Sequence, residues 1–251
     1  MRFQNKQALI TGASSGIGYA SALALADEGA NIAFTYNKNA DGARALEQAI
    51  REKGRKVIGF QVDMTRDEDI DRLVDDIHHQ FGPVDILFNN AGGLVERMPF
   101  LETRKDKWDE IMALNLWSVV RLSQKIGLDM KARGGGVIIN NASVAGRFGG
   151  GIGASAYGTA KGAVITLTKA MGRELIADNI RVNAIAPGII DTPFHTHFTP
   201  PDVMRELMSR VPIGRPGTAE EVARVVAFLA SDDSSYLVGA TIDVNGGQWV
   251  V

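Results

Sequence analysis

The sequence predicts an α/β fold in which helices cover both faces of a doubly wound parallel sheet. Short apolar runs alternate with amphipathic stretches of helical period along most of the 251 residues. Because the runs are almost wholly apolar, we expect strands that are buried on both faces. A glycine-rich turn joins the first run to the first helical stretch, as in a nucleotide-binding βαβ unit. These observations together predict a three-layer α/β/α sandwich.

About seven strands and at least five helices follow from the pattern. The strands are expected at 8–10, 32–35, 57–60, 84–88, 137–140, 182–185 and 241–244. The helices are expected at 16–28, 41–53, 67–81, 106–132 and 156–177. Thr218 and Glu221 have the spacing of a capping box, which predicts another helix start before the apolar stripe of Val222, Val225, Val226 and Leu229.

Composition excludes several classes of function. The net charge of -2 gives no electrostatic reason to expect nucleic acid or an anionic membrane as a partner. Since there are no cysteines, disulfides and thiolate-ligated metals are excluded. No segment reaches the ~18 consecutive apolar residues of a membrane span, and the first residues lack the core of a signal peptide. We expect a single cytoplasmic domain over residues 1–251.

A proline-rich stretch interrupts the alternation of strands and helices. It covers about 190–216 and directly follows a predicted strand end. In open parallel sheets, ligands bind beyond the carboxyl ends of strands, so this stretch is a candidate substrate lid. An ordinary surface excursion is the alternative.

Residues 11–18 (Thr-Gly-Ala-Ser-Ser-Gly-Ile-Gly) follow the first predicted strand and open the first predicted helix. Glycines permit a tight turn, and they let backbone N–H groups at a helix N-terminus approach a pyrophosphate. The spacing is G-x-x-x-G-x-G rather than the commoner G-x-G-x-x-G. A purely structural turn is possible, but the position between strand and helix favours a dinucleotide site.

Tyr157 and Lys161 are one helical turn apart, and Ser143 lies a short loop upstream. A nearby ammonium favours the phenolate form of tyrosine, so this pair can exchange a proton near neutral pH. The serine hydroxyl can hold a carbonyl or alcohol oxygen. By itself, a tyrosine and a lysine at this spacing on a helix surface indicate little.

The chain resembles the short-chain dehydrogenase/reductases, whose fold is a Rossmann-type sheet. The motifs that carry the resemblance run through the chain in order: residues 11–18, 89–92 (Asn-Asn-Ala-Gly), Asn115, Ser143, Tyr157, Lys161, 187–188 with Thr192, and 243–248. The resemblance implies an NAD(P)(H)-dependent oxidoreductase that interconverts a ketone or aldehyde and an alcohol by hydride transfer.

The resemblance also implies roles for individual residues. Tyr157 would be the general acid/base, Lys161 would lower its pKa and hold the nicotinamide ribose, Ser143 would orient the carbonyl, and Asn115 would position a proton-relay water. The cofactor would contact Gly12, Ser14, Ser15, Gly16, Ile17, Gly18, Asn37, Lys38, Asp63, Met64, Asn90, Ala91, Gly92, Tyr157, Lys161, Pro187, Gly188, Ile190 and Thr192.

The second predicted strand indicates which cofactor is preferred. An NAD enzyme usually has an acidic residue about 20 positions beyond the glycines, but here Asn37 and Lys38 stand there. A cation beside a neutral amide suits a 2′-phosphate, so NADP(H) is favoured over NAD(H). Ser15 argues the other way, because many NADP-preferring relatives have a basic residue at that position. No metal is expected, since His195 and His197 lack a clear third ligand.

The substrate is the least determined part. The interval from Ser143 to Tyr157 is one residue longer than is common in the family, and its glycine-rich loop resembles that of keto-deoxy sugar acid (4-deoxy-L-erythro-5-hexoseulose uronate) reductases. Arg97 or Arg147 could pair with such a carboxylate, and His195 could bond its hydroxyls. Surface salt bridges are the alternative for both arginines.

Two other functions remain open. The overall pattern also resembles 3-oxoacyl-acyl-carrier-protein reductases, which need a basic docking surface such as Arg121, Lys125, Lys131 and Arg133 could form. A non-catalytic nucleotide-binding protein is disfavoured, since it would have no need of all four catalytic residues. By resemblance we expect a homotetramer with a small-molecule substrate, in which the two long helices and the C-terminal segment make the contacts.

Overall fold

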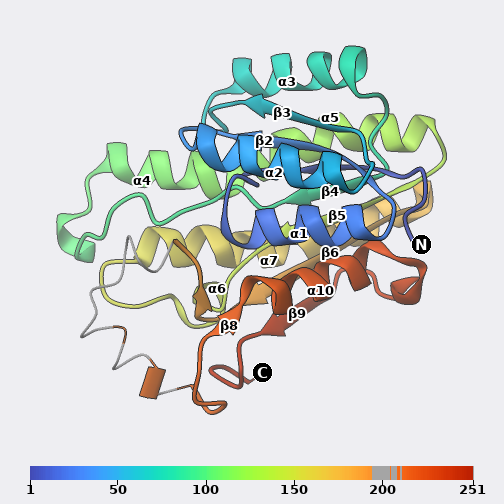
Figure 1. Ribbon diagram of the computed structural model, residues 1–251. Helices are drawn as coiled ribbons and strands as arrows, with labels where there is room; N and C mark the ends of the chain where they lie inside the picture. The colour runs from blue at the N-terminus through green and yellow to red at the C-terminus, as the bar shows by residue number, and fades with distance from the viewer. Residues whose placement is uncertain (194–203, 205–207, 210, 251) are drawn as a thin grey trace.

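The computed structural model describes residues 1–193, 204, 208–209 and 211–250, and its centre is a seven-stranded parallel sheet (Figure 1). The strand order is β3-β2-β1-β4-β5-β6-β9. The strands are β1 (Gln7–Ile10), β2 (Asn31–Tyr36), β3 (Val57–Gln61), β4 (Ile86–Asn89), β5 (Gly136–Asn141), β6 (Ile180–Pro187) and β9 (Thr241–Val244). The order changes direction between β1 and β4, which is where such sheets bind ligands.

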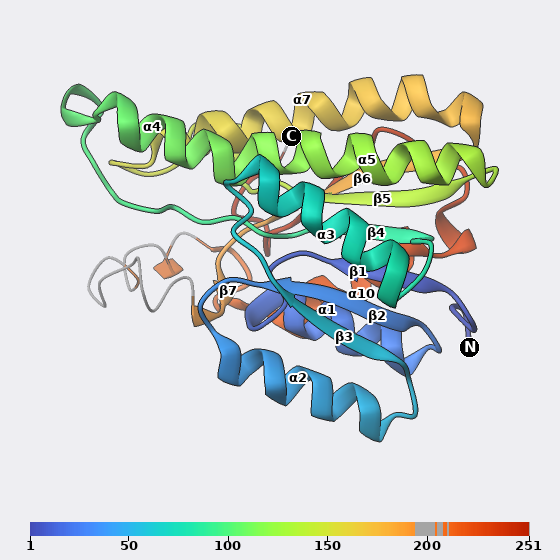
Figure 2. The same cartoon turned by 90° about the horizontal axis from the view of Figure 1, so that it is seen from above.

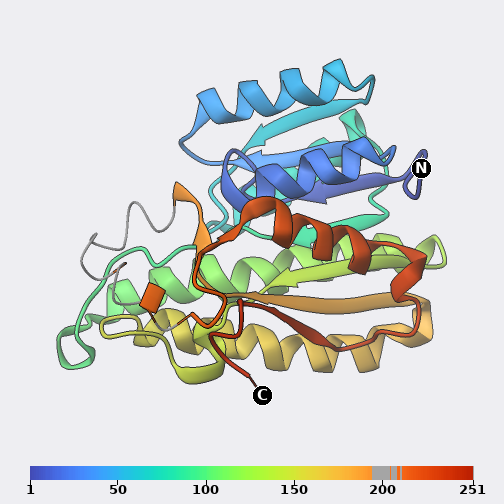
Figure 3. The same cartoon turned by 60° about the horizontal axis from the view of Figure 1, so that its bottom comes forward.

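Helices cover both faces of this sheet, as Figure 2 shows from above. One face carries α1 (Gly16–Asp27), α2 (Ala40–Glu52) and α10 (Ala219–Ala230). The other carries α3 (Asp67–Gln80), α5 (Ser118–Ala132) and α7 (Ser155–Leu175), with α4 (Lys105–Met112) leading into α5. The predicted α/β/α sandwich is therefore confirmed. Figure 3 shows α10 lying along α1, although the two are about as far apart in sequence as the chain allows.

The core is divided by the sheet into two large clusters, because each strand sends alternate side chains to opposite faces. Ile10, Phe34 and Phe88 face α1, α2 and α10. Leu9, Leu87 and Ile138 face α3 and α5. All six are completely or almost completely buried. This packing fixes the carboxyl ends of the central strands at one edge.

The predicted helix at 106–132 is divided. A π-helical turn (Ala113–Trp117) separates α4 from α5 and contains the buried Asn115. A hydrophobic period cannot reveal such a turn, since one extra residue shifts the apolar stripe only slightly. The predicted strand at 84–88 begins two residues later than expected, at Ile86. Short elements that were not predicted include the helix α6 (Ala145–Phe148) and the strands β7 (Ile190–Asp191) and β8 (Gly217–Thr218), which pair with each other.

The predicted capping box at the start of α10 is confirmed. Thr218 Oγ1 accepts from Glu221 N at 3.2 Å, and Glu221 Oε2 accepts from Thr218 N at 2.8 Å. The side chain of Arg215 also pairs with Glu221. Two of the backbone donors at the start of the helix are therefore satisfied by side chains of the same turn.

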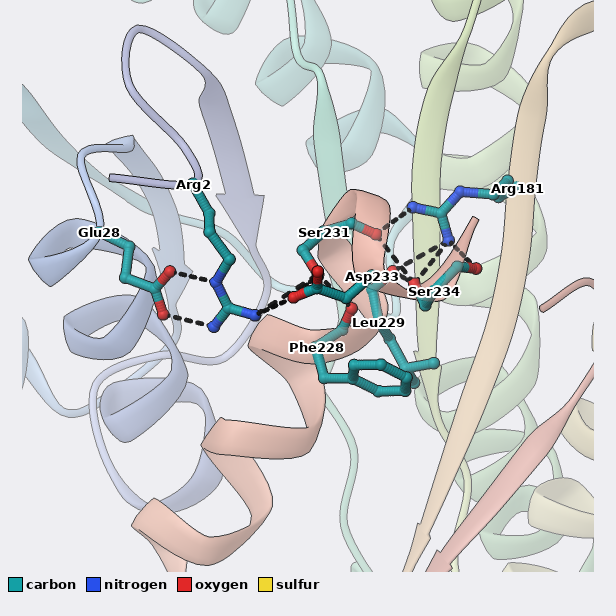
Figure 4. A network of polar contacts seen from close by, with 8 residues as sticks. All are labelled: Arg2, Glu28, Arg181, Phe228, Leu229, Ser231, Asp233 and Ser234. Atoms are coloured by element: carbon teal, nitrogen blue, oxygen red, sulfur yellow. Dashed lines mark hydrogen bonds and ion pairs between the residues drawn. The ribbon is translucent and has the colours of Figure 1, made fainter. Parts of the chain in front are cut away.

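The other end of α10 is held by two arginines from distant parts of the chain (Figure 4). The buried Arg181 of β6 donates to the carbonyl oxygens of Leu229, Ser231 and Ser234 at 2.8–3.2 Å. A cation is favourable there because the last carbonyls of a helix lack partners and carry partial negative charge. On the solvent side, Arg2 joins Glu28 at the end of α1 to Asp233.

Most of the predicted lid at 190–216, including His195, lies outside the described residues. The stretch begins with β7 and is followed directly by β8, and these two strands pair with each other through Ile190 and Gly217. Among the described residues, no helix is long and apolar enough to cross a membrane.

Candidate active site

The predicted phosphate loop lies between β1 and α1, at the carboxyl edge of the sheet. Thr35 of β2 holds it on one side, since Gly12 N donates to Thr35 Oγ1 at 3.1 Å and Ala13 N donates to Thr35 O at 3.0 Å. Gly12 and Gly16 have φ of +66° and +57°, a region that glycine adopts without strain. A Cβ on Gly18 would lie 2.5 Å from Asn90 Nδ2. The loop is therefore packed so closely that only glycine fits at this last position.

The N-terminus of α1 suits a phosphate group. Ser15 precedes the helix without capping it through its side chain, and the first turn contains no acidic residue. Its backbone N–H groups and the positive end of the helix dipole are therefore directed at the loop, which is the arrangement that binds a pyrophosphate.

The second predicted binding segment follows β2. Asn37 and Lys38 are exposed there. The next residue, Asn39, caps α2 by accepting from Gly42 N at 3.0 Å, and its Nδ2 donates to Ser14 O at 3.0 Å. Because Asn39 joins α2 to the phosphate loop, it fixes where Lys38 lies relative to that loop.

Asp63 and Met64 lie beyond β3, next to the same edge. Met64 is buried in the core. Asp63 is tied to its own loop, since its Oδ1 accepts from Thr65 N and Thr65 Oγ1 at 3.0 and 2.7 Å. Both positions are compatible with the adenine contact that the resemblance implies.

Asparagine side chains line the floor of the site between β1, β4 and β5. Asn90 Nδ2 donates to the carbonyls of Thr11 and Gly12 at 2.9 and 3.0 Å. One residue earlier, the buried Asn89 donates to Asn140 Oδ1 and Ser123 Oγ, both at 2.9 Å. Where the strands separate, these side-chain amides form the hydrogen bonds that a neighbouring strand would otherwise form. Asn90 thereby holds the phosphate loop against the centre of the sheet.

Ser143, Tyr157 and Lys161 converge at the carboxyl end of β5, as their spacing predicts. Tyr157 is hydrogen-bonded to the Ser143 side chain. The Lys161 Nζ donates to Asn141 O at 2.7 Å and lies 5.7 Å from the centroid of the Tyr157 ring. Ser143 Oγ also accepts from Ala145 N at 3.1 Å, which fixes its rotamer. The two hydroxyls and the amine therefore form one cluster.

The direction of the tyrosine pKa differs from the expectation. Burial raises the pKa of Tyr157, and the hydrogen bond with Ser143 lowers it by less. Burial also lowers the pKa of Lys161 to about 8. The reason is that the ammonium is directed at the Asn141 carbonyl and the ring rather than at the phenol oxygen, so desolvation dominates for both groups.

Asn115 lies in the π turn and faces the same cluster. It exchanges two hydrogen bonds with Gly93, through Nδ2 to Gly93 O at 2.9 Å and from Gly93 N to Oδ1 at 3.0 Å. A Cβ on Gly92 would lie 2.8 Å from Asn115 Oδ1 and 3.0 Å from Lys161 Nζ. Since one point is within hydrogen-bond distance of both atoms, the space above Gly92 can join Asn115 to Lys161.

The predicted nicotinamide wall follows β6. Gly188 N donates to Val244 O at 3.0 Å, and a side chain on Gly188 would collide with Asn245. Pro187 is buried and its carbonyl accepts from Val144 N, which ties this wall to the Ser143 loop. Thr192 is in contact distance of Gly16, so the wall closes over the phosphate loop.

On the substrate side, residues 94–98 lie against the glycine-rich loop. Met98 N donates to Gly153 O at 3.1 Å, and Arg97 donates to Ile152 O at 3.0 Å. A narrow pocket beside Tyr157, too small to hold a water molecule, is lined by both segments, with Leu94, Glu96, Met98, Thr103, Ile111 and residues 153–156 in its wall. Arg97 therefore supports this pocket from outside through a backbone carbonyl.

Arg147 has a different environment from the one expected of a substrate ligand. Its guanidinium pairs with both carboxylate oxygens of Asp243 at 3.1–3.2 Å and also donates to Thr241 O. This ion pair is largely buried and ties α6 to β9. The charge of Arg147 is thus matched within the chain, and the structure gives it a structural role.

The basic residues on and after α5 are also paired. Lys125 Nζ lies 2.9 Å from Asp71 Oδ1, and Arg121 Nε lies 3.4 Å from Asp67 Oδ2. Lys131 and Arg133 lie 3.0 Å from Asp178 and Asp85, respectively. As a result, this surface carries less net positive charge than the sequence suggests.

Four residues that hold the site were not singled out from the sequence: Thr11, Thr35, Asn39 and Asn141. Each acts through a backbone group or another amide. Thr11 Oγ1, for example, accepts from the backbone N of both Asn90 and Ala91 at 2.9 Å. Bracing of this kind depends on the distance between strands, which sequence spacing does not give. Among the described residues, no three His, Asp or Glu side chains are placed to share a metal ion.

Comparisons with known proteins agree with this geometry. Residues 12–248 match a family model described as enoyl-(acyl carrier protein) reductase. The chain is 40% identical over 252 residues to the 3-oxoacyl-(acyl-carrier-protein) reductase FabG of Escherichia coli (strain K12), with 100% of both chains covered.

Solved structures match equally well. L-sorbose reductase from Gluconobacter frateurii, complexed with NADPH and L-sorbose, has a TM-score of 0.91 and 35% identity over 100% of both chains. A 7α-hydroxysteroid dehydrogenase complexed with NADH and 7-oxo glycochenodeoxycholic acid has a TM-score of 0.92 and 33% identity, covering 98% of this chain and 95% of that one.

Proposed function

The chain belongs to the short-chain dehydrogenase/reductase family and is an NAD(P)-dependent oxidoreductase acting on CH–OH groups, and we propose that Tyr157 is its general acid/base. The observation that carries this proposal is the cluster of Tyr157, Ser143 and Lys161 at the carboxyl end of β5. It lies at the same edge of the sheet as the phosphate loop and the wall after β6, one strand beyond the switch point between β1 and β4.

Each polar group of the cluster has a distinct task. A bound nicotinamide supplies the hydride to a carbonyl carbon, or accepts it from an alcohol in reverse. Tyr157 donates the proton to the carbonyl oxygen as its negative charge develops. Ser143 donates a hydrogen bond to the same oxygen and orients it. Lys161 and Asn115, which face one another across Gly92, return the proton from solvent to Tyr157.

The residues present fit a dinucleotide. Gly12, Gly16 and the first turn of α1 would hold the pyrophosphate, and Pro187, Gly188, Ile190 and Thr192 would hold the nicotinamide. We propose that NADP(H) is preferred, because the exposed Lys38 has an amide on either side and no acidic residue before Asp41. The cofactors named for the two solved relatives differ, NADPH in one and NADH in the other, so this preference rests on Asn37 and Lys38 alone.

A 3-oxoacyl thioester is the substrate class that relatives favour. The similarity to 3-oxoacyl-(acyl-carrier-protein) reductases covers the whole chain, including both segments of the substrate pocket. The wall contains Leu94, Met98 and Ile111 beside Tyr157, which are apolar side chains that an acyl chain could pack against.

A ketone of a sugar or sugar acid is the second candidate. It is supported by the similarity to L-sorbose reductase and by the salt bridges on and after α5, which neutralise the basic residues that an acidic carrier protein would need. Glu96 and Thr103 give the pocket polar groups that could bond hydroxyls. Arg97 stays a predicted ligand of a substrate carboxylate, and its guanidinium donates to Ile152 O in this structure.

The test is an NADPH and NADH oxidation screen. Its substrates are a 3-oxoacyl thioester, the same 3-oxoacyl group on its carrier protein, several keto sugars and keto-deoxy sugar acids, and simple ketones. We expect the specificity constant kcat/KM for one class to exceed the others by at least about 10²-fold. No turnover of any carbonyl, together with stoichiometric nucleotide binding, would instead support a non-catalytic binding protein.

We also propose that the chain forms a homotetramer. Trp117 and Leu128, on the π turn and α5, are more than half exposed, so a second copy packed on this helix would cover both apolar side chains. Light scattering after gel filtration measures the assembly mass directly. A substrate lid formed by residues 190–216 and a cytoplasmic location stay predictions.

A further inference from the structure

Asn141, the last residue of β5, has a side-chain oxygen that is buried without a partner. Its Oδ1 is inaccessible to solvent and accepts no hydrogen bond within the part of the chain that the structure describes. Its Nδ2 does have a partner, since it donates to Asn90 Oδ1 at 3.0 Å. Leaving a buried acceptor unsatisfied costs free energy, so such an atom at a ligand site calls for an explanation.

The orientation of the Asn141 amide follows from the network around it. Asn90 Nδ2 faces two carbonyl acceptors, those of Thr11 and Gly12, so this end of Asn90 must be the NH₂ group. The other end of Asn90 is therefore the oxygen, and it needs a donor. Asn141 must meet it with its own NH₂ group, which directs Asn141 Oδ1 elsewhere.

Asn141 also connects the two functional halves of the site. On one side it reaches the phosphate loop through Asn90. On the other side, its backbone carbonyl accepts a hydrogen bond from Lys161 Nζ at 2.7 Å. Asn141 also lies only two residues before Ser143 in the sequence. The adenosine end is expected beyond β2 and β3, on the far side of β1 and β4 from β5. An acceptor at Asn141 is thus next to the proton-transfer groups and distant from the adenine.

We infer that Asn141 is a cofactor-binding residue whose Oδ1 accepts a hydrogen bond from the nicotinamide riboside half of the dinucleotide. That half offers two kinds of donor, the ribose hydroxyls and the carboxamide N–H. Either bond would satisfy the buried oxygen and hold the reacting ring in register with Lys161. The inference deepens the proposed cofactor site and rests on it.

The test is a binding series on the whole chain, measured by calorimetry without turnover. The ligands are NADPH, the matching phosphorylated ADP-ribose that lacks nicotinamide, and the matching adenosine bisphosphate that lacks the second ribose as well. We expect Asn141→Leu to weaken NADPH binding about tenfold and to leave the adenosine bisphosphate unchanged. If the variant also binds the phosphorylated ADP-ribose more weakly, the bond is assigned to a ribose hydroxyl. If binding of the ADP-ribose is unchanged, the bond is assigned to the carboxamide.

Thr241→Val is the matched control. Thr241 Oγ1 is another buried oxygen without a partner in the described chain, but it lies in β9 at the sheet edge. Removing it should leave all three affinities unchanged. If Asn141→Leu melts early, Asn141→Ala serves in the same series.

Two outcomes would overturn the inference. If Asn141→Leu weakens the binding of all three ligands equally, Asn141 acts only through Asn90 and the phosphate loop. If NADPH binding is unchanged, the Asn141 Oδ1 atom has no part in cofactor binding. A wild-type chain that binds none of the ligands would instead reject the cofactor site itself.

Discussion

Asn115 and Gly93 exchange two hydrogen bonds, so that an asparagine side chain pairs with a backbone segment as a neighbouring strand would. A third bond, from Asn115 Nδ2 to Ile111 O at 2.9 Å, ties the same amide to the last turn of α4. The segment that ends β4 is therefore fixed to the helix that carries Asn115. This pairing sets the width of the space above Gly92.

Gly92→Ala should reduce kcat by about 10²-fold, because the added methyl group would enter the space between Asn115 and Lys161. Gly93→Ala is the matched control, since a Cβ there has no neighbour closer than 3.8 Å. Steady-state kinetics of the two variants give the comparison. Equal losses would show that backbone flexibility, and not the space above Gly92, limits the rate.

Tyr157→Phe should lower kcat by about 10³-fold while the Kd for NADPH changes less than about threefold. The variant loses only the hydroxyl that is bonded to Ser143 and keeps the ring beneath Lys161. Stopped-flow turnover and fluorescence titration measure the two quantities. A variant that kept the wild-type rate would exclude Tyr157 as the acid/base.

The pH dependence of stability should reveal the buried lysine. Burial lowers the pKa of Lys161 to about 8 in the folded chain, below its usual value of about 10.5. Between these values the unfolded chain binds more protons than the folded one, so stability rises with pH across the window. Relative to Lys161→Met, the wild-type free energy of unfolding should gain about 3 kcal/mol from pH 8 to 10.5.

Urea denaturation of both proteins at several pH values in this window measures that gain, because titrating groups that lie away from residue 161 cancel in the difference. Parallel curves would mean that the Lys161 ammonium is solvated in the folded state.

Lys38→Ala should raise the Kd for NADPH about tenfold and leave the Kd for NADH within about twofold, because only NADPH carries the 2′-phosphate. Arg44→Ala is the control, since Arg44 lies nearby on α2 but already pairs with Asp41. The difference between the two cofactors should shrink at high salt. An equal effect on NADPH and NADH would remove the assignment of Lys38 to the phosphate.

Arg181→Met should lower the free energy of unfolding by about 3 kcal/mol, since three carbonyls at the end of α10 lose a charged donor in a buried site. Arg2→Met, at the exposed side of the same helix end, should cost less than about 1 kcal/mol. Chemical denaturation measures both. Similar losses would indicate that the end of α10 is held from outside.

The sequence predicts the order and type of the elements because buried parallel strands and amphipathic helices differ strongly in their apolar period. It also predicts where Tyr157, Ser143 and Lys161 meet, since one helical turn and one short loop fix their separation. The π turn at Asn115 escapes prediction because it changes the period by a single residue. The paired state of Arg147 depends on a partner almost a hundred residues away, Asp243, and no local pattern contains that information.

The direction of the Tyr157 pKa was wrong for a similar reason. Spacing shows that a lysine is near, but the balance between charge and desolvation depends on burial and on where the ammonium points. The role of Asn141 likewise appears only when the neighbouring amides are oriented. The predicted NADP(H) preference and the individual cofactor contacts remain predictions.

The packing of α10 along α1 makes cofactor binding depend on a part of the chain that is synthesised long after the phosphate loop. α1 supplies the backbone N–H groups of the phosphate loop, and its inner side chains Ala22 and Leu25 are in one cluster with Val222 and Val226 of α10. During translation, the loop therefore precedes by some two hundred residues the helix that completes its support. Affinity for the nucleotide should arise only once α10 has folded against α1, so nucleotide binding would indicate that this packing is in place.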